Sequence, residues 1–467
     1  MPLEASASSR STSGPGDGRK VRLSMARPLS ITLPGRVLGE SWTYLLALVV
    51  LAGLTFVGTR APLLGAVTVF LAALLVLLVC FDLARVGTGA ITLAMFLAPL
   101  NDLRLGASYV TGSDIMFVIG IAILAPTLLR NKVSIPPLFL LGLGILFTMG
   151  VVASVASAIP VVSINQVARL LVGAFMLPIF FMIWRPQIKI TVRLAAAYVF
   201  GCVFSVGWGL LSGPVAGDAR YVGFTYHPNY LGLECLLAAA LTPYLVAKIS
   251  PGYRWIFWFA AIINAYGVYI SGSRAALLVL GMLVVIYPFV EGSIRAVGAV
   301  MLGVAGVLAF SGRLLQEDGN SALGRLFGNG SASGSDIERQ NVLAEAWKLF
   351  LEHPFLGNGF DGGLGSHNIY LQVATAVGIF GLLGYLLVLW TALRPLFWQG
   401  INHRLAYPVL AYGTIGPLTN TLWDRLIWSV IALTFAANLD RPPPSNDVTP
   451  TPAGRPRRSL TTTRTSA

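Results

Sequence analysis

Long apolar blocks separated by short polar segments run along most of this 467-residue chain. The block 368–391, for example, contains no charged residue, and about 20 apolar residues in a helix are enough to cross a bilayer. Charged residues make up 11% of the chain, whereas a soluble domain carries about 25%. Such a chain has too little polar surface to cover a water-soluble fold. We therefore predict an all-α, polytopic integral membrane protein.

The apolar blocks predict about twelve to fourteen membrane helices. The third and the last two of the fourteen could instead be re-entrant or interfacial. The approximate spans are 41–58, 62–81, 87–100, 114–129, 137–157, 164–184, 194–213, 229–247, 255–271, 275–290, 294–311, 368–391, 405–420 and 423–438.

Polar tails flank the predicted membrane domain, 41–438, on both sides. Residues 1–40 are rich in Ser, Gly, Pro and Arg, and residues 439–467 have a similar composition. Neither segment has an apolar period, so we predict two disordered tails. The chain is thus organised as a basic tail, one membrane domain and a second basic tail.

The net charge of +13 predicts topology rather than nucleic-acid binding. The basic residues lie mainly in the two tails and in short segments between apolar blocks, and cytoplasmic loops of membrane proteins are enriched in Lys and Arg. Placing residues 1–40 in the cytoplasm puts most of the 32 Lys and Arg there, whereas the reverse orientation would export them. Both termini are therefore predicted to be cytoplasmic.

One predicted outer loop, about residues 312–367, is much longer than the others. Within it, the apolar residues Leu343, Trp347, Phe350 and Leu351 fall on one face of a possible helix. Such an amphipathic helix could lie on the membrane surface or cover a cavity. A glycine-rich stretch, 357–366, follows it.

Three polar clusters fall on the same outer side in this topology. They are DARYVGFTYHPNYLGLE (218–234), SGSRAA (271–276) and GSHNIYL (365–371). Arg220 and Arg274 could simply anchor helix ends by snorkelling, but a guanidinium can also bind a phosphate bidentately. His367 could cap a helix or accept a proton at neutral pH. We interpret this coincidence as a site.

Other polar residues leave alternatives open. Arg169 and Glu234 lie inside predicted spans, where they could pair with each other or line a water-filled cavity. His403 is interpreted as a topology charge. All three cysteines, Cys80, Cys202 and Cys235, fall in apolar blocks, so neither a disulfide framework nor a metal site is predicted.

The segment HNIYLQVATAVGIFG (367–381) resembles the signature of the O-antigen ligase and O-antigen polymerase family. There a His followed by Asn, Ser or Gln precedes a Gly and a small residue, as in His367, Asn368, Gly378 and Gly381. The stretches HPFLGNGF (353–360), RYVGFTYHPNYLG (220–232) and GSRAALL (272–278) resemble other motifs of the family. The resemblance covers about residues 160–440.

This resemblance implies a glycosyltransferase of the bacterial cytoplasmic membrane, active in surface polysaccharide or lipopolysaccharide biosynthesis. Its donor would be a glycan linked to undecaprenyl diphosphate. By resemblance, Arg220 and Arg274 would bind the diphosphate and His367 would be the general base, while Asn229, Arg339 and Asn368 are further predicted substrate-binding residues. The transfer would invert the anomeric centre and need no metal or other cofactor.

Two other function classes remain open. A transporter or flippase would carry several charges midway through its spans or glycine-broken helices in paired halves. Only Arg169 and Glu234 suggest this, and no clear internal repeat exists. A non-enzymatic scaffold would leave the co-facial Arg220, Arg274 and His367 unexplained. The acceptor, whether lipid A core, a second lipid-linked glycan or a protein, stays open.

Overall fold

The computed structural model describes residues 82–104, 110–131, 133–215, 219–309, 321–326, 332–360, 366–398, 400 and 402–437. All of them belong to one compact unit, Leu78–Ala467. The predicted tails and the first two predicted spans, 41–58 and 62–81, lie outside these residues.

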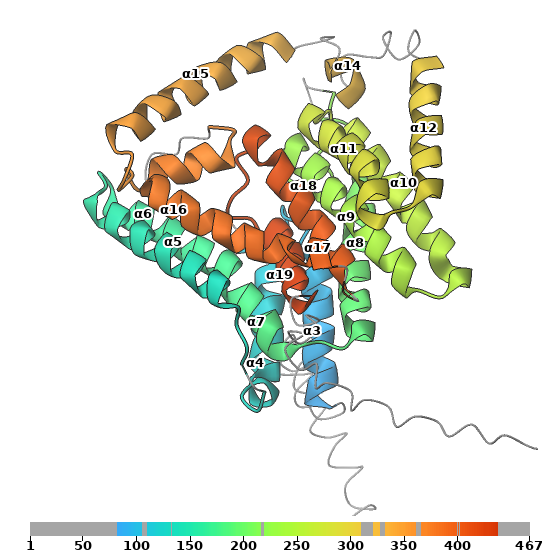
Figure 1. Cartoon of the computed structure of the whole chain (residues 1–467), viewed down its shortest axis with the longest axis horizontal. Coiled ribbons are helices and arrows are strands. Elements are labelled where there is room, and N and C mark those ends of the chain that lie inside the picture. The colour runs from blue at the N-terminus through green and yellow to red at the C-terminus, as the bar shows by residue number, and fades with distance from the viewer. Residues whose placement is uncertain are drawn as a thin grey trace, which may run out of the picture. The chain divides into compact units, whose positions relative to one another are not determined.

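The described part of the chain is α-helical, and its one extended pairing is an isolated bridge between Arg104 and Thr111. The helices, shown in Figure 1, are α3 (Leu83–Leu97), α4 (Gly112–Leu128), α5 (Pro137–Ala156), α6 (Pro160–Leu171), α7 (Leu177–Trp184), α8 (Ile188–Ser212), α9 (Pro228–Lys248), α10 (Arg254–Ile270), α11 (Arg274–Glu291), α12 (Ile294–Ala309), α14 (Ala322–Leu326), α15 (Ala332–Glu352), α16 (Ile369–Leu393), α17 (Pro395–Trp398), α18 (Tyr407–Ile415) and α19 (Arg425–Ala437). A π-helical turn, Val172–Met176, joins α6 to α7.

Six of the described helical segments are long and apolar enough to cross a membrane. They are Pro137–Ala156, Pro160–Trp184, Ile188–Ser212, Pro228–Lys248, Arg274–Glu291 and Ile369–Trp398. Many of their large apolar side chains are exposed to the surroundings, as expected of helices that face lipid. The all-α, multi-pass membrane class predicted from the sequence is confirmed.

The predicted span 405–420 is not one continuous helix. It contains α18, which is only 9 residues long and is flanked by short 3-10 turns. Pro417 has no backbone N–H to donate and cannot continue a helix, which explains the end at Ile415. This segment is too short to cross a bilayer by itself.

The close crossing of α5 and α16 fixes the position of α16. At Gly142 a Cβ atom would lie 2.8 Å from the carbonyl oxygen of Gly384, and at Gly384 it would lie 2.7 Å from that of Gly142. Small residues let membrane helices approach closely enough for extensive van der Waals contact. Figure 1 shows α16 lying along α5. The glycine pair therefore anchors the helix that follows His367.

The polar segments predicted to share one membrane side meet in the structure. Asp102 donates a backbone hydrogen bond of 2.8 Å to Phe224, and Tyr221 donates one of 3.3 Å to Ile270. These bonds join the α3–α4, α8–α9 and α10–α11 connections at one end of the helices. The predicted outer clusters 218–234 and 271–276 therefore come from separate stretches of chain but meet at one end of the helices.

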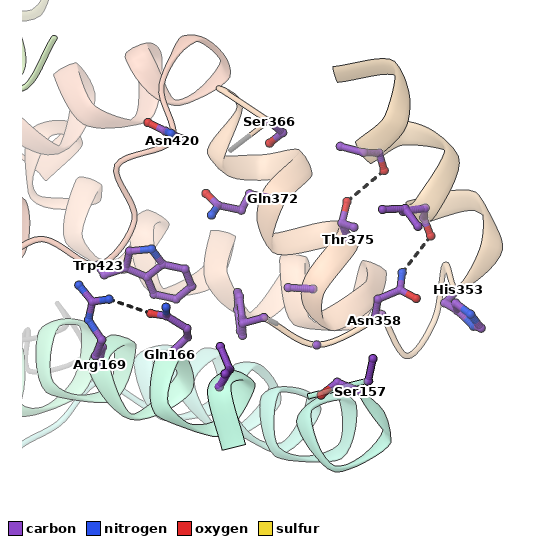
Figure 2. A pocket seen from close by; sticks show the side chains of 18 of the residues that line it. Ser157, Gln166, Arg169, His353, Asn358, Ser366, Gln372, Thr375, Asn420 and Trp423 are labelled. Carbon is purple, nitrogen blue, oxygen red and sulfur yellow. Dashed lines mark hydrogen bonds between the residues drawn. The ribbon is translucent and has the colours of Figure 1, made fainter. Parts of the chain in front are cut away.

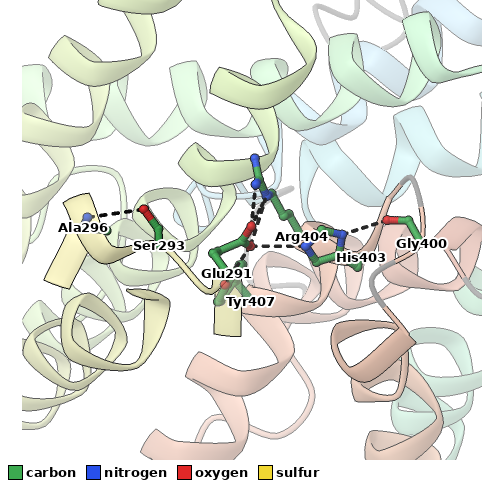
Figure 3. Close-up of polar contacts among 7 residues, drawn as sticks. All are labelled: Glu291, Ser293, Ala296, Gly400, His403, Arg404 and Tyr407. Atoms are coloured by element: carbon green, nitrogen blue, oxygen red, sulfur yellow. Dashed lines mark hydrogen bonds and ion pairs between the residues drawn. The ribbon is translucent and has the colours of Figure 1, made fainter. Parts of the chain in front are cut away.

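A second polar cluster lies at the other end of α11. Glu291, whose side chain is 7% exposed, accepts hydrogen bonds from Arg404 and from the Tyr407 hydroxyl at 3.0 Å (Figure 3). His403 Nε2 lies 3.2 Å from the same carboxylate, and its Nδ1 lies 2.7 Å from the Gly400 carbonyl oxygen. His403 is therefore part of a structural contact between α11 and the segment before α18.

Candidate functional site

His367 stands immediately before α16, in a backbone conformation that is uncommon for any residue except glycine. Its φ is +49°, in the left-handed region. The Ser366 hydroxyl donates to the Asn368 carbonyl oxygen at 2.9 Å, and the Asn368 side-chain oxygen accepts from Leu371 N at 3.1 Å. Asn368 is therefore the N-cap of α16. The capped turn holds His367 in a strained backbone conformation of the kind that often occurs at functional sites.

A break inside α16 explains the glycine of the 367–381 motif. Gly378 has φ +69°, and a Cβ atom there would lie 2.1 Å from the carbonyl oxygen of Phe355. The loop after α15 packs into this break, because Asn358 and Gly359 donate backbone hydrogen bonds to Thr375 and Ala376, both at 2.8 Å. The two motifs 353–360 and 367–381 are thus bonded to each other.

A small pocket of about 30 Å³ has three arginines in its lining, Arg274, Arg325 and Arg339. We call it the arginine pocket. Its lining is Asn229, Gly272, Ser273, Arg274, Ala275, Arg325, Arg339, Ile415, Leu418 and Thr419. Arg325 is only 6% exposed, and its Nε has no hydrogen-bond partner among the described residues. Such a pocket suits an anion with several acceptor oxygens, such as a phosphate.

Arg220 lies behind the arginine pocket. It is 6% exposed, and its Nε donates to the Ser271 carbonyl oxygen at 2.8 Å. One terminal nitrogen donates to the Asn229 side-chain oxygen at 2.7 Å. Arg220 therefore braces two parts of the pocket wall, Asn229 and the α10–α11 turn.

The surroundings of His367 favour its neutral form. The side chain is half-buried, and burial lowers its pKa below the ordinary value of 6.5. The positive charge of Arg339 lowers the pKa further, while the negative charge of Glu338 opposes this. A neutral imidazole can accept a proton, so His367 is in the state that a general base requires.

A second, larger hollow of about 850 Å³ lies on the other side of Ser366 (Figure 2). We call it the large cavity. Its lining combines amides, hydroxyls, aromatic rings and both signs of charge, in Arg104, Ala156, Ser157, Ala158, Val162, Gln166, Arg169, Tyr226, Tyr230, Ala346, Leu349, His353, Leu356, Gly357, Asn358, Gly359, Phe360, Ser366, Gln372, Thr375, Ala376, Asn420, Trp423 and Asp424.

The structure brings most of the predicted site residues together. The arginine pocket is lined by Asn229, Arg274 and Arg339, and Arg220 contacts Asn229. The positive charge of Arg339 lowers the pKa of His367. Asn368 caps α16 through its side-chain oxygen.

Arg169 and Glu234 have different surroundings. Arg169 lines the large cavity and donates to Gln166 Oε1 at 3.0 Å, which is the cavity alternative left open by the sequence. Glu234 is fully buried, and its backbone oxygen accepts a contact of 3.5 Å from the Cys202 thiol.

Sequence reasoning missed Arg325, Gln372 and Trp423. Arg325 had a usable signal, because it lies in the predicted outer loop, 312–367. Positive charge is disfavoured on the outer side, where Arg220 and Arg274 were also predicted to lie, in other segments. Gln372 and Trp423 had none, since each lies within or beside an apolar block and only the fold turns it toward the large cavity.

The apolar face predicted for the amphipathic helix does not pack against α16. Leu343, Trp347 and Leu351 are 40%, 54% and 58% exposed. The contact with α16 is made instead by Ala346, whose carbonyl oxygen accepts from the Thr375 hydroxyl at 3.2 Å. Helix α15 therefore keeps an outward apolar face, as expected of a helix that lies on a membrane surface.

A comparison with known protein families matches part of the chain that carries these residues. Residues 259–386 match the family described as O-antigen ligase. The match runs from α10 into α16 and is shorter than the resemblance predicted over 160–440, but it includes Arg274, Arg325, Arg339 and His367. No curated protein matches the chain.

The chain thus has the fold of a multi-pass membrane protein, and its residues 259–386 are similar to the O-antigen ligase family. This confirms the predicted resemblance. The family assignment indicates an enzyme of the glycosyltransferase kind that takes part in assembling cell-surface polysaccharide, with a lipid-linked glycan and an acceptor as its general partners.

Proposed function

We propose that this protein transfers a glycan from undecaprenyl diphosphate to an acceptor hydroxyl at the outer face of the bacterial cytoplasmic membrane. The observation that carries the proposal is the convergence of Arg274, Arg325 and Arg339 on one pocket next to His367. A lipid diphosphate places its charged group at the depth of helix ends, which is where this pocket lies.

In the proposed reaction His367 removes the proton from the acceptor hydroxyl. The resulting oxygen attacks the anomeric carbon from the side opposite the diphosphate, so the configuration inverts. The bond from that carbon to the diphosphate oxygen breaks, and its electron pair leaves with the diphosphate. The three guanidinium groups stabilise the charge that develops there, so the proposed transfer is metal-independent.

Two residues act indirectly in this scheme. Arg220 positions Asn229 and the Ser271 carbonyl through the hydrogen bonds described above, so it shapes the pocket wall. Asn368 positions His367 by capping α16. Both were predicted to bind substrate, and we now propose positioning roles for them.

The test is deletion of the gene followed by complementation and analysis of surface glycans. The wild-type chain should restore long surface glycan, and His367→Ala and Arg325→Ala should fail at equal membrane protein level. Arg193→Ala, at an exposed arginine of α8, is the matched control and should restore it. Restoration by His367→Ala would refute the assigned base.

The deletion strain also separates the acceptors. Finished polymer accumulating on its lipid carrier would indicate a ligase. Loss of all long polymer with a normal acceptor would indicate a polymerase. Unaltered lipid-linked and lipopolysaccharide glycans with unglycosylated exported proteins would indicate a protein glycosyltransferase. Unchanged glycans with altered solute uptake would instead favour a transporter.

A further inference from the structure

The large cavity and the arginine pocket are each lined by a residue that neighbours His367. Ser366, directly before His367, lines the large cavity, and Arg339, whose charge acts on His367, lines the arginine pocket. If His367 acts as the proposed base, it lies between a neighbour that lines the large cavity and one that lines the arginine pocket. If the arginine pocket holds the leaving group, the large cavity is the place for the molecule that carries the attacking hydroxyl.

Two side chains give the large cavity its chemical character. Gln372 projects into it from α16, and its Oε1 is buried without a hydrogen-bond partner among the described residues (Figure 2). That oxygen requires a donor, and a buried acceptor left unsatisfied costs about 1–3 kcal/mol. A hydroxyl group on a ligand is a donor of the right kind.

Trp423 supplies a flat apolar surface beside Gln166 and Arg169 (Figure 2). Its ring is held by Phe360, which packs edge-on with ring centres 5.0 Å apart at 79°. A ring buttressed in this way presents a fixed plane to a ligand. Tyr226, also on the cavity wall, is held similarly by the Arg104 guanidinium, 4.6 Å from its ring centre.

This combination fits a sugar better than an acyl chain or an anion. A sugar ring has apolar C–H faces that pack on aromatic rings and hydroxyls that bond to amides. An acyl chain would leave the buried Gln372 Oε1 without a hydrogen-bond donor, which is unfavourable. Asp424 on the wall offsets the charge of Arg169, and the second arginine of the wall, Arg104, lies over the Tyr226 ring. The arginine pocket, by contrast, is lined by three arginines and no acidic residue.

We propose that the large cavity binds an uncharged oligosaccharide portion of the acceptor, with Gln372 and Trp423 as its main recognition residues. The assignment of this saccharide as the acceptor rests on the proposed glycan transfer, but saccharide binding itself does not. The volume of about 850 Å³ lies within the range of ligand sites, about 300–1,000 Å³, and favours several sugar rings over one.

Binding is tested on the purified full chain in lipid nanodiscs. The probes are core and repeat-unit oligosaccharides released from the host's own surface glycans by mild acid, so they carry neither lipid nor diphosphate. Saturation-transfer NMR measures the affinity. The wild-type chain should bind, and Trp423→Ala and Gln372→Leu should each weaken binding about tenfold or more. Gln372→Leu changes little in size, which preserves folding, and thermal unfolding verifies this for both variants.

Two matched controls accompany these variants. Trp390→Ala removes an exposed tryptophan near the far end of α16, and Arg325→Ala removes a cation from the arginine pocket. Both should bind the oligosaccharides as the wild type does.

The outcomes are distinguishable. Three results would each overturn the saccharide proposal. They are no binding of the oligosaccharides by the wild type, unchanged binding by Trp423→Ala and Gln372→Leu, and occupation of the cavity by a fatty acid that the oligosaccharides do not displace. Transfer that persists in His367→Ala would overturn the proposed function while leaving the saccharide result intact.

Discussion

Arg220 donates a 2.7 Å hydrogen bond to the side-chain oxygen of Asn229, and both groups lie at the junction of the α8–α9 loop with α9. Only Asn229 reaches the arginine pocket; Arg220 is buried behind it. The contact makes one wall of the pocket depend on a residue that does not line it. Asn229 is therefore the residue that faces a ligand in the pocket, and Arg220 is the residue that holds Asn229 in place.

A double-mutant cycle tests this support. Arg220→Lys should lower the transfer rate at least about tenfold, because a hydrogen bond from a charged group contributes about 1.5–3 kcal/mol and Lys cannot reproduce both contacts of the guanidinium. Asn229→Ala should have a similar effect, and the double variant should be little worse than either. Additive losses, measured as transfer per amount of membrane protein, would show that the residues act separately.

The pH profile of transfer tests the role of His367. A general base works in its neutral form, so activity should rise as pH increases through the depressed pKa of His367 and then level off. Arg339→Gln removes a charge that lowers this pKa, so the acid limb, the rising part of the curve of activity against pH, should move to higher pH. Glu338→Gln removes a charge that raises it, so the limb should move to lower pH.

These opposite shifts form an internal control. Arg339→Gln is also expected to slow transfer at every pH because Arg339 lines the arginine pocket, but a change in rate alone does not move a limb. An acid limb that stays in place in both variants would argue that a group other than His367 titrates.

Gly378→Ala tests the break in α16. The substitution requires a left-handed backbone at a residue with a side chain and places a methyl group against the Phe355 carbonyl. We expect it to destabilise the protein by more than about 2 kcal/mol, since holding a residue with a side chain in this essentially glycine-only conformation alone costs about 1–3 kcal/mol. Thermal unfolding in detergent measures this.

Gly144→Ala, on neighbouring α5, is the matched control. A methyl group there meets nothing within 4 Å, and its backbone φ is ordinary for a helix. It should leave the unfolding temperature unchanged or raise it slightly. Equal behaviour of the two variants would mean that the break does not contribute to stability.

Arg404→Ala tests the cluster at the other end of α11. It would leave the buried Glu291 carboxylate without its bidentate partner. We therefore expect the free energy of unfolding to fall by about 3 kcal/mol. This value is near the low end for breaking a buried ion pair, because Arg404 is 28% exposed. Arg193→Ala removes an exposed arginine and should cost little. Unfolding temperatures and protein level in the membrane measure the difference, and equal values would contradict the structural role.

The sequence predicted the helices more completely than the site. Uncharged blocks such as 368–391 are sufficient to predict α16, because lipid tolerates no other backbone structure there. The break at Gly378 could not be predicted in the same way, since it depends on a contact with Phe355, a residue remote in the chain. The failure of 405–420 to form one helix was signalled locally by Pro417.

For the site, charge and topology placed Arg220, Arg274 and His367 at one end of the helices. They could not show that Arg220 hydrogen-bonds to the wall of the arginine pocket and does not line it, because direction depends on the turns that carry it. Nor could they show the large cavity, whose walls come from α6, α16 and the segment before α19. A cavity forms only when the helices pack together, so the position of Gln372 on a cavity wall could not be predicted from the sequence.

The loop after α15 enters the break of α16 through backbone groups, those of Pro354, Asn358 and Gly359. Backbone groups are the same for almost every amino acid, so many side chains in this loop can change without loss of the pairing. The spacing cannot change, because one added or missing residue would shift every donor past its acceptor. Evolution of this protein should therefore tolerate substitutions at the exposed Phe355 and Leu356 far better than insertions or deletions in this loop. Gly357 and Gly359, which have positive φ and no room for a Cβ atom, should stay glycine.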